Sequence, residues 1–473
     1  MGSHWLPIAD LAADVQAGKT TALELVEKSL KNIEDHQDYQ AIIATISKRA
    51  KERAKTIDGL VAAGKNAGRL AGVPFIAKDN FLVLGVETTA ASNILKGFNA
   101  PYQATVIEKL EAEGAICVAK ANMDAFGHGA STENSDFFVT KNPHDPLRVP
   151  GGSSGGSAAS VVLDMAPFAL GTDTGGSTRQ PASMSGCVGY KPTYGLMSRS
   201  GIVAMASSTD TVGTLARTTT DAALVIDVMA GRDDLDGTTI ERQDSYVSAN
   251  ASLKGQKIGV VKEWMDEGLD EDVKSVVESA IAKLKAAGAS VREVSLPSLP
   301  LALAVYYVLV PAEISSNLSR YDGQRYGYNS GEAKDLETSY RRSREIGFGK
   351  EAKRRIMIGT YVLSSGYYDA YYKKAQTVRT KLINEFNDAF NQFDFLVGPV
   401  APTIAFKIGA KADPLQMYLC DVMTVAASMV GCPSISLPAG LSGNLPVGLQ
   451  LMAPQKADKQ LLALAGSAEE LLK

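Results

Sequence analysis

A glycine-rich segment at residues 150–181 constrains the fold of this chain more than any other feature of the sequence. Its glycines alternate with serine and threonine, as they do in flexible linkers. Two apolar runs, 158–163 and 166–170, interrupt this pattern and belong in a core. Glycine turns beside buried elements let the backbone approach a ligand closely. The segment therefore predicts a site inside a folded domain and argues against a linker.

Short apolar runs alternate with amphipathic stretches along most of the chain. Thr21 and Glu24 form a capping box at the start of the first helix. We predict helices over about 21–34, 40–63, 105–114 and 270–287, and strands over 73–77, 115–119, 257–261, 290–294, 395–398, 433–437 and 447–451. Residues 295–393 are mainly helical in pattern, and 257–294 form a β-α-β unit. This alternation is typical of an α/β protein with a sheet covered by helices.

Composition excludes several classes of protein. The 473 residues carry a net charge of −4, whereas a domain that grips nucleic acid by its phosphates is usually basic. No apolar stretch reaches the roughly 18 residues of a membrane span, and no secretory signal is visible. The four cysteines form no CxxC pair and only four histidines are present, so we expect no metal site, no disulfide framework and a cytoplasmic location.

A near match to a phosphate-binding loop occurs at residues 59–66. Asn66 stands where a serine or threonine hydroxyl should meet magnesium, and the stretch follows a helix instead of a strand. We therefore interpret it as a helix end capped by glycine.

Three segments together indicate acyl-transfer chemistry. They are Gly-Val-Pro-Phe-Ile-Ala-Lys-Asp-Asn at 72–80, Val-Pro-Gly-Gly-Ser-Ser-Gly-Gly-Ser at 149–157, and Gly-Thr-Asp-Thr-Gly-Gly-Ser-Thr-Arg-Gln-Pro at 171–181. Such chemistry needs an activated nucleophile, a base and donors for the oxyanion. Ser177 follows two glycines in a turn, where its hydroxyl can be exposed. Backbone N–H groups of Thr174, Gly175, Gly176 and Ser177 are the candidate oxyanion hole.

The base is less obvious from the residues alone. His128 is the one well-placed histidine candidate, and Lys78 follows an apolar strand that could bury it. A lysine has an ordinary pKa of about 10.4, and burial can lower it by ~3–5 units. A lysine on a surface turn beside Asp79 is the competing interpretation.

The three segments resemble those of the amidase-signature hydrolases, and the resemblance runs along nearly the whole chain. It implies a single domain over residues 5–473, with a central mixed β-sheet covered by helices on both faces. It also implies a Ser–cis-Ser–Lys set, in which Ser177 is the nucleophile, Ser153 the bridging serine with a cis peptide bond, and Lys78 the base.

Within this family the chain is most similar to the A subunits of bacterial aspartyl/glutamyl-tRNA amidotransferases. The segments that carry this similarity lie at 142–152, 189–195, 206–210, 313–327, 347–356, 365–371 and 445–451. The resemblance implies glutamine as substrate, with Tyr306, Arg355 and Asp421 as binding residues. Tyr307 and Arg354 compete for two of these roles.

The same resemblance implies partners. B and C subunits would complete a heterotrimer, in which a partner uses ATP and magnesium and contacts the tRNA. This chain itself would need no cofactor and no membrane.

The chain departs from the pattern of these subunits at several positions, three of which bear on the site. Ala125 replaces a usual glutamate, His128 a usual methionine, and Thr178 a usual isoleucine. His128 is either a substrate contact or a hydrogen-bonded structural histidine. Two other functions remain open: a stand-alone amidase for other small amides, and a catalytically idle scaffold, against which the intact Lys78, Ser153 and Ser177 argue.

Overall fold

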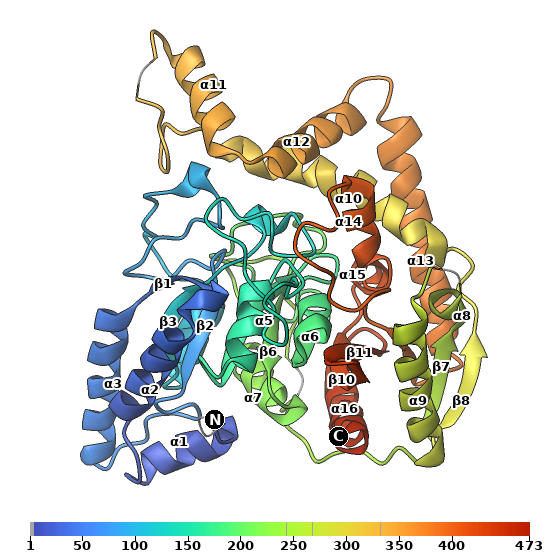
Figure 1. The fold of residues 1–473 in the computed structure, drawn as a ribbon, viewed down its shortest axis with the longest axis horizontal. Helices are drawn as coiled ribbons and strands as arrows, with labels where there is room; N and C mark the ends of the chain where they lie inside the picture. Colours follow the sequence, from blue (N-terminus) through green and yellow to red (C-terminus); the bar gives the residue numbers. More distant parts are fainter. Residues whose placement is uncertain (1–3, 243, 267, 332) are drawn as a thin grey trace.

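The computed structural model describes residues 4–242, 244–266, 268–331 and 333–473. One sheet of eleven strands crosses this structure (Figure 1), in the order β1-β3-β2-β4-β6-β5-β10-β11-β9-β7-β8. The strands are β1 Ile42–Thr45, β2 Pro74–Lys78, β3 Ile116–Ala121, β4 Phe168–Asp173, β5 Val188–Lys191, β6 Thr211–Ala216, β7 Lys257–Val261, β8 Ser290–Val294, β9 Phe395–Pro399, β10 Ser434–Ser442 and β11 Leu445–Met452. The edge strand β1 is antiparallel to β3, the pairs β3-β2-β4 and β9-β7-β8 are parallel, and the strands between β4 and β9 pair antiparallel, so the sheet is mixed.

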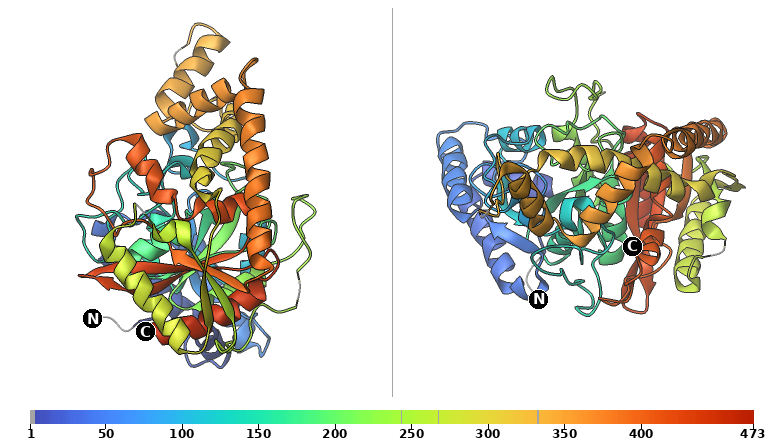
Figure 2. Two further views of the ribbon diagram at one scale, coloured as in Figure 1. Left: turned by 90° about the vertical axis from the view of Figure 1, so that its right-hand side faces the viewer. Right: turned by 90° about the horizontal axis from the view of Figure 1, so that it is seen from above.

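Helices cover both faces of this sheet (Figure 2). A Cβ built at Gly189 would lie 2.5 Å from Ala182 of α6, whereas the next residue, Tyr190, donates to Asp458 of α16 at 2.8 Å. Successive side chains of a strand point to opposite faces, so α6 and α16 lie on opposite sides. The helices around the sheet are α1 Ile8–Gln16, α2 Ala22–Asp35, α3 Ser47–Ala62, α4 Thr105–Ala112, α5 Gly155–Val162, α6 Arg179–Ser185, α7 Thr219–Met229, α8 Lys262–Met265, α9 Glu271–Ala286 and α16 Asp458–Leu472.

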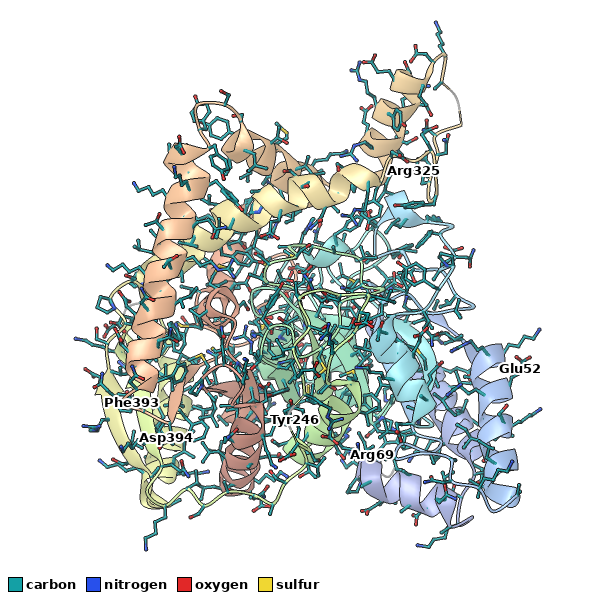
Figure 3. The ribbon with its side chains drawn as sticks, turned by 180° about the vertical axis from the view of Figure 1, so that it is seen from behind. Glu52, Arg69, Tyr246, Arg325, Phe393 and Asp394 are labelled. Atoms are coloured by element: carbon teal, nitrogen blue, oxygen red, sulfur yellow. The ribbon has the colours of Figure 1, made fainter. Side chains whose placement is uncertain are left out.

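A group of helices that comes between β8 and β9 in the chain lies above the sheet, over one set of strand ends, and extends across most of the width of the sheet (Figures 1 and 2). We call this group the cap; it consists of α10 Ala302–Asn317, α11 Leu336–Gly347, α12 Lys350–Leu363 and α13 Lys374–Phe390. Behind the sheet, α13 descends to Phe393 and Asp394 (Figure 3), where Asp394 accepts a hydrogen bond from Lys257 N of β7 at 2.8 Å. Two short helices, α14 Pro414–Tyr418 and α15 Val425–Val430, lie beneath the cap.

The helical segment that contains α10 is the most apolar part of the cap. Leu299–Arg320 is long and apolar enough, by length and composition alone, to cross a membrane. It packs against α12, α13 and α15, and half of its most apolar window is buried in the protein. We therefore interpret Leu299–Arg320 as the central helix of the cap, whose apolar side chains pack against its neighbours.

Most of the predicted elements are confirmed. Thr21 Oγ1 accepts from Glu24 N and the Glu24 carboxylate accepts from Thr21 N, as a capping box requires. The β-α-β unit is present, with β7 and β8 parallel. Residues 59–62 form the last turn of α3, and Gly64 lies just beyond it at a φ of +70°, which confirms the glycine-capped helix end.

The prediction of one helix over 40–63 is partly wrong. Residues 42–45 form β1 instead, which pairs antiparallel with β3, and α3 begins at Ser47. The run Ile-Ile-Ala-Thr contains β-branched residues, which suit a strand. A neighbouring strand from a distant part of the chain therefore decides its conformation.

Candidate active site

Lys78 is the last residue of β2, and its ammonium lies fully inside the protein. Its Nζ lies 2.8 Å from Ser153 Oγ, 2.9 Å from Ser154 Oγ and 2.9 Å from Thr172 Oγ1. Burial lowers the pKa of Lys78 from 10.5 to about 7, although three nearby aspartates act in the opposite direction. The side chain is therefore largely neutral just above neutral pH, and a neutral amine can accept a proton. The exposed-turn interpretation of Lys78 is wrong.

Ser153 lies in the loop that leads into α5, and this loop is packed too tightly for larger residues. The peptide bond between Gly152 and Ser153 is cis. A Cβ at Gly152 would lie 2.2 Å from the carboxylate of Asp124, so only glycine fits there. Asp124 N donates to Ser153 O at 3.3 Å, and Gln180 Oε1 accepts from Gly152 N at 2.8 Å. These contacts hold the Ser153 hydroxyl beside Lys78.

Ser177 lies in the turn between β4 and α6, next to Ser153 and Ser154. Ser154 N donates to Ser177 O at 3.1 Å, which ties the two loops together. Among the hydrogen bonds of the described residues, none joins the two hydroxyls of Ser153 and Ser177. Likewise, none is donated by the backbone N–H groups of Gly175, Gly176 or Ser177. These three donors remain available for an oxyanion.

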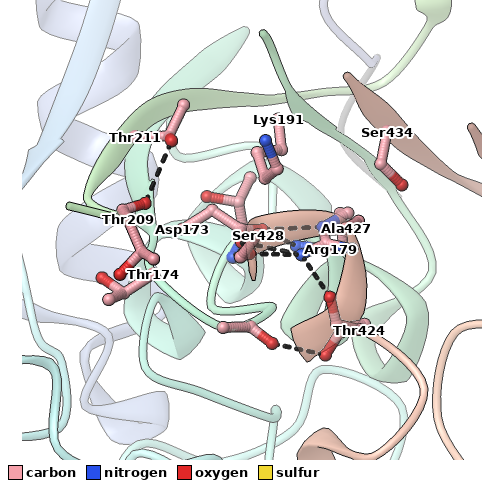
Figure 4. A network of polar contacts seen from close by, with 12 residues as sticks. Asp173, Thr174, Arg179, Lys191, Thr209, Thr211, Thr424, Ala427, Ser428 and Ser434 are labelled. Carbon is pink, nitrogen blue, oxygen red and sulfur yellow. Dashed lines mark hydrogen bonds and ion pairs between the residues drawn. The ribbon is translucent and has the colours of Figure 1, made fainter. Parts of the chain in front are cut away.

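An ion pair beneath this turn fixes its shape (Figure 4). The guanidinium of Arg179 donates to both carboxylate oxygens of Asp173, at 2.9 and 2.8 Å, and both side chains are fully buried. Arg179 also donates to Thr424 O at 3.1 Å, and Thr424 Oγ1 donates to Gly175 O at 2.6 Å. The turn is thereby joined to the segment that precedes α15.

A cavity of about 330 Å³ opens between the cap and the loops that surround this turn. Arg355 of α12 and Asp421 are both part of its lining. Asp421 ends the short helix Leu419–Asp421, three residues before Thr424. Two of the predicted substrate-binding residues therefore share one cavity, and Thr424 connects that cavity to the turn of Ser177.

Arg355 is held by its neighbours in the cap. Its Nε donates to Glu351 Oε1 at 2.9 Å, and its guanidinium lies over the rings of Tyr307 and Tyr418, at 5.3 and 5.5 Å from their centroids. Only 2% of the Arg355 surface is exposed, whereas the side chain of Arg354 is 43% exposed. A buried guanidinium, with five N–H donors in a planar fork, is suited to bind a carboxylate.

Asp421 has an unusual protonation equilibrium. Burial raises its pKa from 3.8 to about 8, and the nearby Asp124 and Asp173 act in the same direction, while Arg355 opposes them. A cation placed beside Asp421 favours its charged form. The side chain is thus suited to pair with an ammonium group.

The two neighbouring tyrosines of α10 occupy different places. Tyr307 lines the cavity beside Arg355. Tyr306 lies behind the turn of Ser177, because a Cβ at Gly175 would be 2.7 Å from its Cε2. Gly175 is therefore required by the close approach of the Tyr306 ring.

A comparison with known protein families adds to this geometry. The family model described as Amidase matches residues 24–462, which include all three segments of the site. The chain belongs to the amidase family. It is 48% identical to the A subunits of the glutamyl-tRNA(Gln) amidotransferases of Thermoanaerobacter pseudethanolicus and Carboxydothermus hydrogenoformans. Each match covers 99% of this chain, and they cover 97% and 98% of the two relatives.

Solved structures of amidase-family proteins have the same fold. The crystal structure of the A subunit of glutamyl-tRNA(Gln) amidotransferase from Thermotoga maritima is similar to this chain, with a TM-score of 0.81 and 40% identity. The similarity covers 98% of this chain and 95% of that one. The predicted fold, one mixed sheet covered by helices on both faces, is confirmed.

Three residues that depart from the expected amidase pattern, Ala125, His128 and Thr178, lie close to the site. Ala125 is buried, and its N–H donates to Asn134 O at 2.7 Å. Thr178 directly follows the nucleophile candidate, and its buried hydroxyl has no partner among the described residues. His128 lines the cavity. Neither of its ring nitrogens has a hydrogen-bond partner in the described parts of the chain, so the expected hydrogen-bonded structural histidine is wrong.

Histidine, cysteine, aspartate and glutamate side chains do not assemble into a metal site among the described residues.

Proposed function

We propose that this chain is the glutaminase component of a tRNA-dependent amidotransferase. Its substrate is glutamine, from which it releases ammonia for the amidation of Glu-tRNA(Gln) or Asp-tRNA(Asn). The observation that carries the proposal is the cavity shared by Arg355 and Asp421, which offers a cation for an α-carboxylate and a carboxylate for an α-ammonium. The near full-length relatives, which are named as A subunits of such enzymes, support it.

Catalysis begins at Ser177. Its Oγ attacks the side-chain amide carbon of glutamine, and its proton passes by way of Ser153 Oγ to the neutral Lys78. The N–H groups from Thr174 to Ser177 stabilise the oxyanion, as preorganised donors do in acyl transfer. The C–N bond then breaks, the proton moves to the departing nitrogen, and ammonia leaves an ester on Ser177. Water hydrolyses this ester to glutamate.

Arg355, Asp421 and Tyr306 orient the substrate. Arg355 binds the α-carboxylate, Asp421 binds the α-ammonium in its ionised form, and Tyr306 supports the turn of Ser177 from behind. Arg354 also lines the cavity, but its side chain is 43% exposed and pairs with Glu351, so we place it outside this set.

Ammonia is the product that links this chain to its partners. The chain, acting as one domain over residues 5–473, assembles with B and C subunits in the cytoplasm. A partner uses ATP and magnesium to activate the tRNA-bound carboxylate and holds the tRNA, which agrees with the acidic pI of about 5.8 of this chain. This chain uses no cofactor of its own.

The test is ammonia release from glutamine by the purified chain, alone and with the B and C subunits. We expect Ser177→Ala and Lys78→Ala to lose at least about 10³-fold in kcat, as catalytic-residue deletions in serine hydrolases do. Ser160→Ala is the matched control, because this buried serine of α5 donates to the backbone carbonyl of Ser157. Full activity of either catalytic variant would sink the mechanism.

A second pair of variants tests the choice of substrate. Arg355→Lys removes a forked donor and raises the KM for glutamine, whereas Arg354→Lys on the next residue leaves it unchanged. Fast turnover of aryl or aliphatic amides by the chain alone, with none of glutamine in the complex, would instead identify a stand-alone amidase.

A further inference from the structure

His128 is a buried side chain that the proposed mechanism does not use. It follows a short turn at Ala125–Gly127, and its backbone is fixed at both ends. His128 N donates to Ala125 O at 3.0 Å, and Asn134 Nδ2 donates to His128 O at 2.8 Å. The ring is completely shielded from solvent, yet it forms part of the wall of the cavity that contains Arg355.

Both ring nitrogens of His128 lack a partner in the parts of the chain that the structure describes. Buried polar atoms of native proteins are nearly always hydrogen-bonded, and each exception calls for an explanation. Packing does not explain this one, since an apolar side chain of similar length would fill the same space without unpaired atoms. The position therefore favours a polar group that enters the cavity.

The charge of the ring limits what that group can be. Burial, and then the positive charge of Arg355, lower the pKa of His128 well below its ordinary value. The neutral imidazole has one N–H donor and one acceptor nitrogen. A protonated ring would be repelled by the positive charge of Arg355. The neutral ring, which keeps one N–H donor, is therefore the form that acts near neutral pH.

Arg355 alone cannot supply hydrogen-bond donors for all the lone-pair sites of a bound carboxylate. Its Nε is engaged by Glu351, whose carboxylate also accepts from Tyr418 Oη at 2.8 Å. Glu351 therefore offsets part of the positive charge of Arg355. A carboxylate has about four lone-pair sites, and a donor beside the guanidinium can occupy one that Arg355 leaves open.

We propose that His128 donates a hydrogen bond to the α-carboxylate of the bound amino acid, beside Arg355. His128 is then a specificity residue, which selects substrates that carry a carboxylate next to the amide-bearing chain. This inference rests on the proposed function and adds a residue to its binding site. Asp421 remains the partner of the α-ammonium.

The main test is the kinetics of His128→Met in the assembled complex. A hydrogen bond to a charged group is worth ~1.5–3 kcal/mol, so we expect the KM for glutamine to rise by about tenfold or more. The kcat should change by less than about twofold, because the triad is untouched. The midpoint of thermal unfolding should stay the same or rise, since two unpaired buried nitrogens are removed.

His36→Met is the matched control. The His36 ring pairs with Asn32 O at 2.9 Å, far from the site in the fold, so this variant should keep the KM of the parent. If His128→Met lowers the unfolding midpoint and leaves the KM unchanged, His128 is structural and the inference is overturned.

Two glutamine analogues identify the group that His128 contacts. Glutaramate keeps the carboxylate and lacks the α-ammonium, whereas 4-aminobutanamide keeps the ammonium and lacks the carboxylate. His128→Met should weaken kcat/KM for glutaramate by about the same factor as for glutamine, and leave that for 4-aminobutanamide unchanged. The opposite pattern would overturn the assignment to the carboxylate.

Two amide substitutions locate the donating nitrogen. The side chain of His128→Asn places an N–H near the position of Nδ1, and that of His128→Gln near the position of Nε2. Recovery of the KM by one of the two supports a hydrogen bond, and recovery by neither contradicts it. If the parent complex hydrolyses no glutamine, the proposed function fails as well; if it does and His128→Met behaves like the parent, only this inference fails.

Discussion

The neutrality of Lys78 can be tested through the stability of the protein, independently of catalysis. Its ordinary pKa is 10.5 and its pKa in the fold is about 7, so between these values the unfolded chain binds one more proton than the folded chain. Stability then rises with pH across this window. The gap corresponds to about 5 kcal/mol in full, at about 1.4 kcal/mol for each pH unit.

Lys78→Met isolates this contribution. The variant loses the hydrogen bonds of Lys78 to Ser153, Ser154 and Thr172. This loss shifts the free energy of unfolding of the variant by an amount that does not depend on pH in this range. Lys191, whose pKa burial lowers to about 8, titrates in both proteins and cancels. We therefore expect the free energy of unfolding of the parent, relative to Lys78→Met, to increase by about 3 kcal/mol between pH 7 and pH 9.5.

Urea unfolding followed by tryptophan fluorescence at several pH values measures this difference. In parallel, kcat for glutamine in the complex should rise through about pH 7 and then level off, as expected for a base that must be neutral in the enzyme–substrate complex. A stability difference that stays constant over the whole window would refute the argument, because Lys78 would then carry its proton in the fold and could not act as the base.

Three further substitutions have defined outcomes. Thr178→Val removes an unpaired buried hydroxyl and should raise the free energy of unfolding by about 1 kcal/mol in urea titrations; a decrease would mean that the hydroxyl is satisfied. Gly175→Ala forces the turn away from Tyr306 and should lower kcat for ammonia release by ~10²-fold, which an unchanged kcat would contradict. Arg179→Met leaves the Asp173 carboxylate buried without its ion-pair partner, and calorimetry should find that the free energy of unfolding falls by ~3–5 kcal/mol. A decrease below about 1 kcal/mol would argue against a stabilising role of the Arg179–Asp173 ion pair.

The parts of the fold that can be predicted from the sequence are those with strong local patterns. The capping box at Thr21 and the unit formed by β7, α9 and β8 are examples, because both arise from residues close together in the chain. By contrast, β5 and β6 escape prediction. They are short, they contain glycine and threonine, and their partners β10 and β4 come from distant parts of the sequence.

The site shows the same division. The three motif segments together make Ser177 a candidate nucleophile, because glycine turns beside buried runs can expose a hydroxyl, whereas the role of Ser153 follows only from the family resemblance. Burial of Lys78 cannot be derived from its own surroundings in the sequence, because its hydrogen-bond partners come from two other segments, at Ser153–Ser154 and at Thr172. The unpaired ring of His128 depends on what the cap and residues 409–421 bring near it, which no local pattern encodes.

The cap supplies Arg355, whereas the sheet and its adjoining turns supply Lys78, Ser153 and Ser177. In the proposed mechanism, the cap residue that binds the α-carboxylate and the groups that break the amide bond thus belong to different stretches of the chain. Substitutions in α12 can therefore alter which amide is accepted without disturbing the bond-breaking residues. This division provides a physical route by which one scaffold acquires new substrates while its reaction is kept.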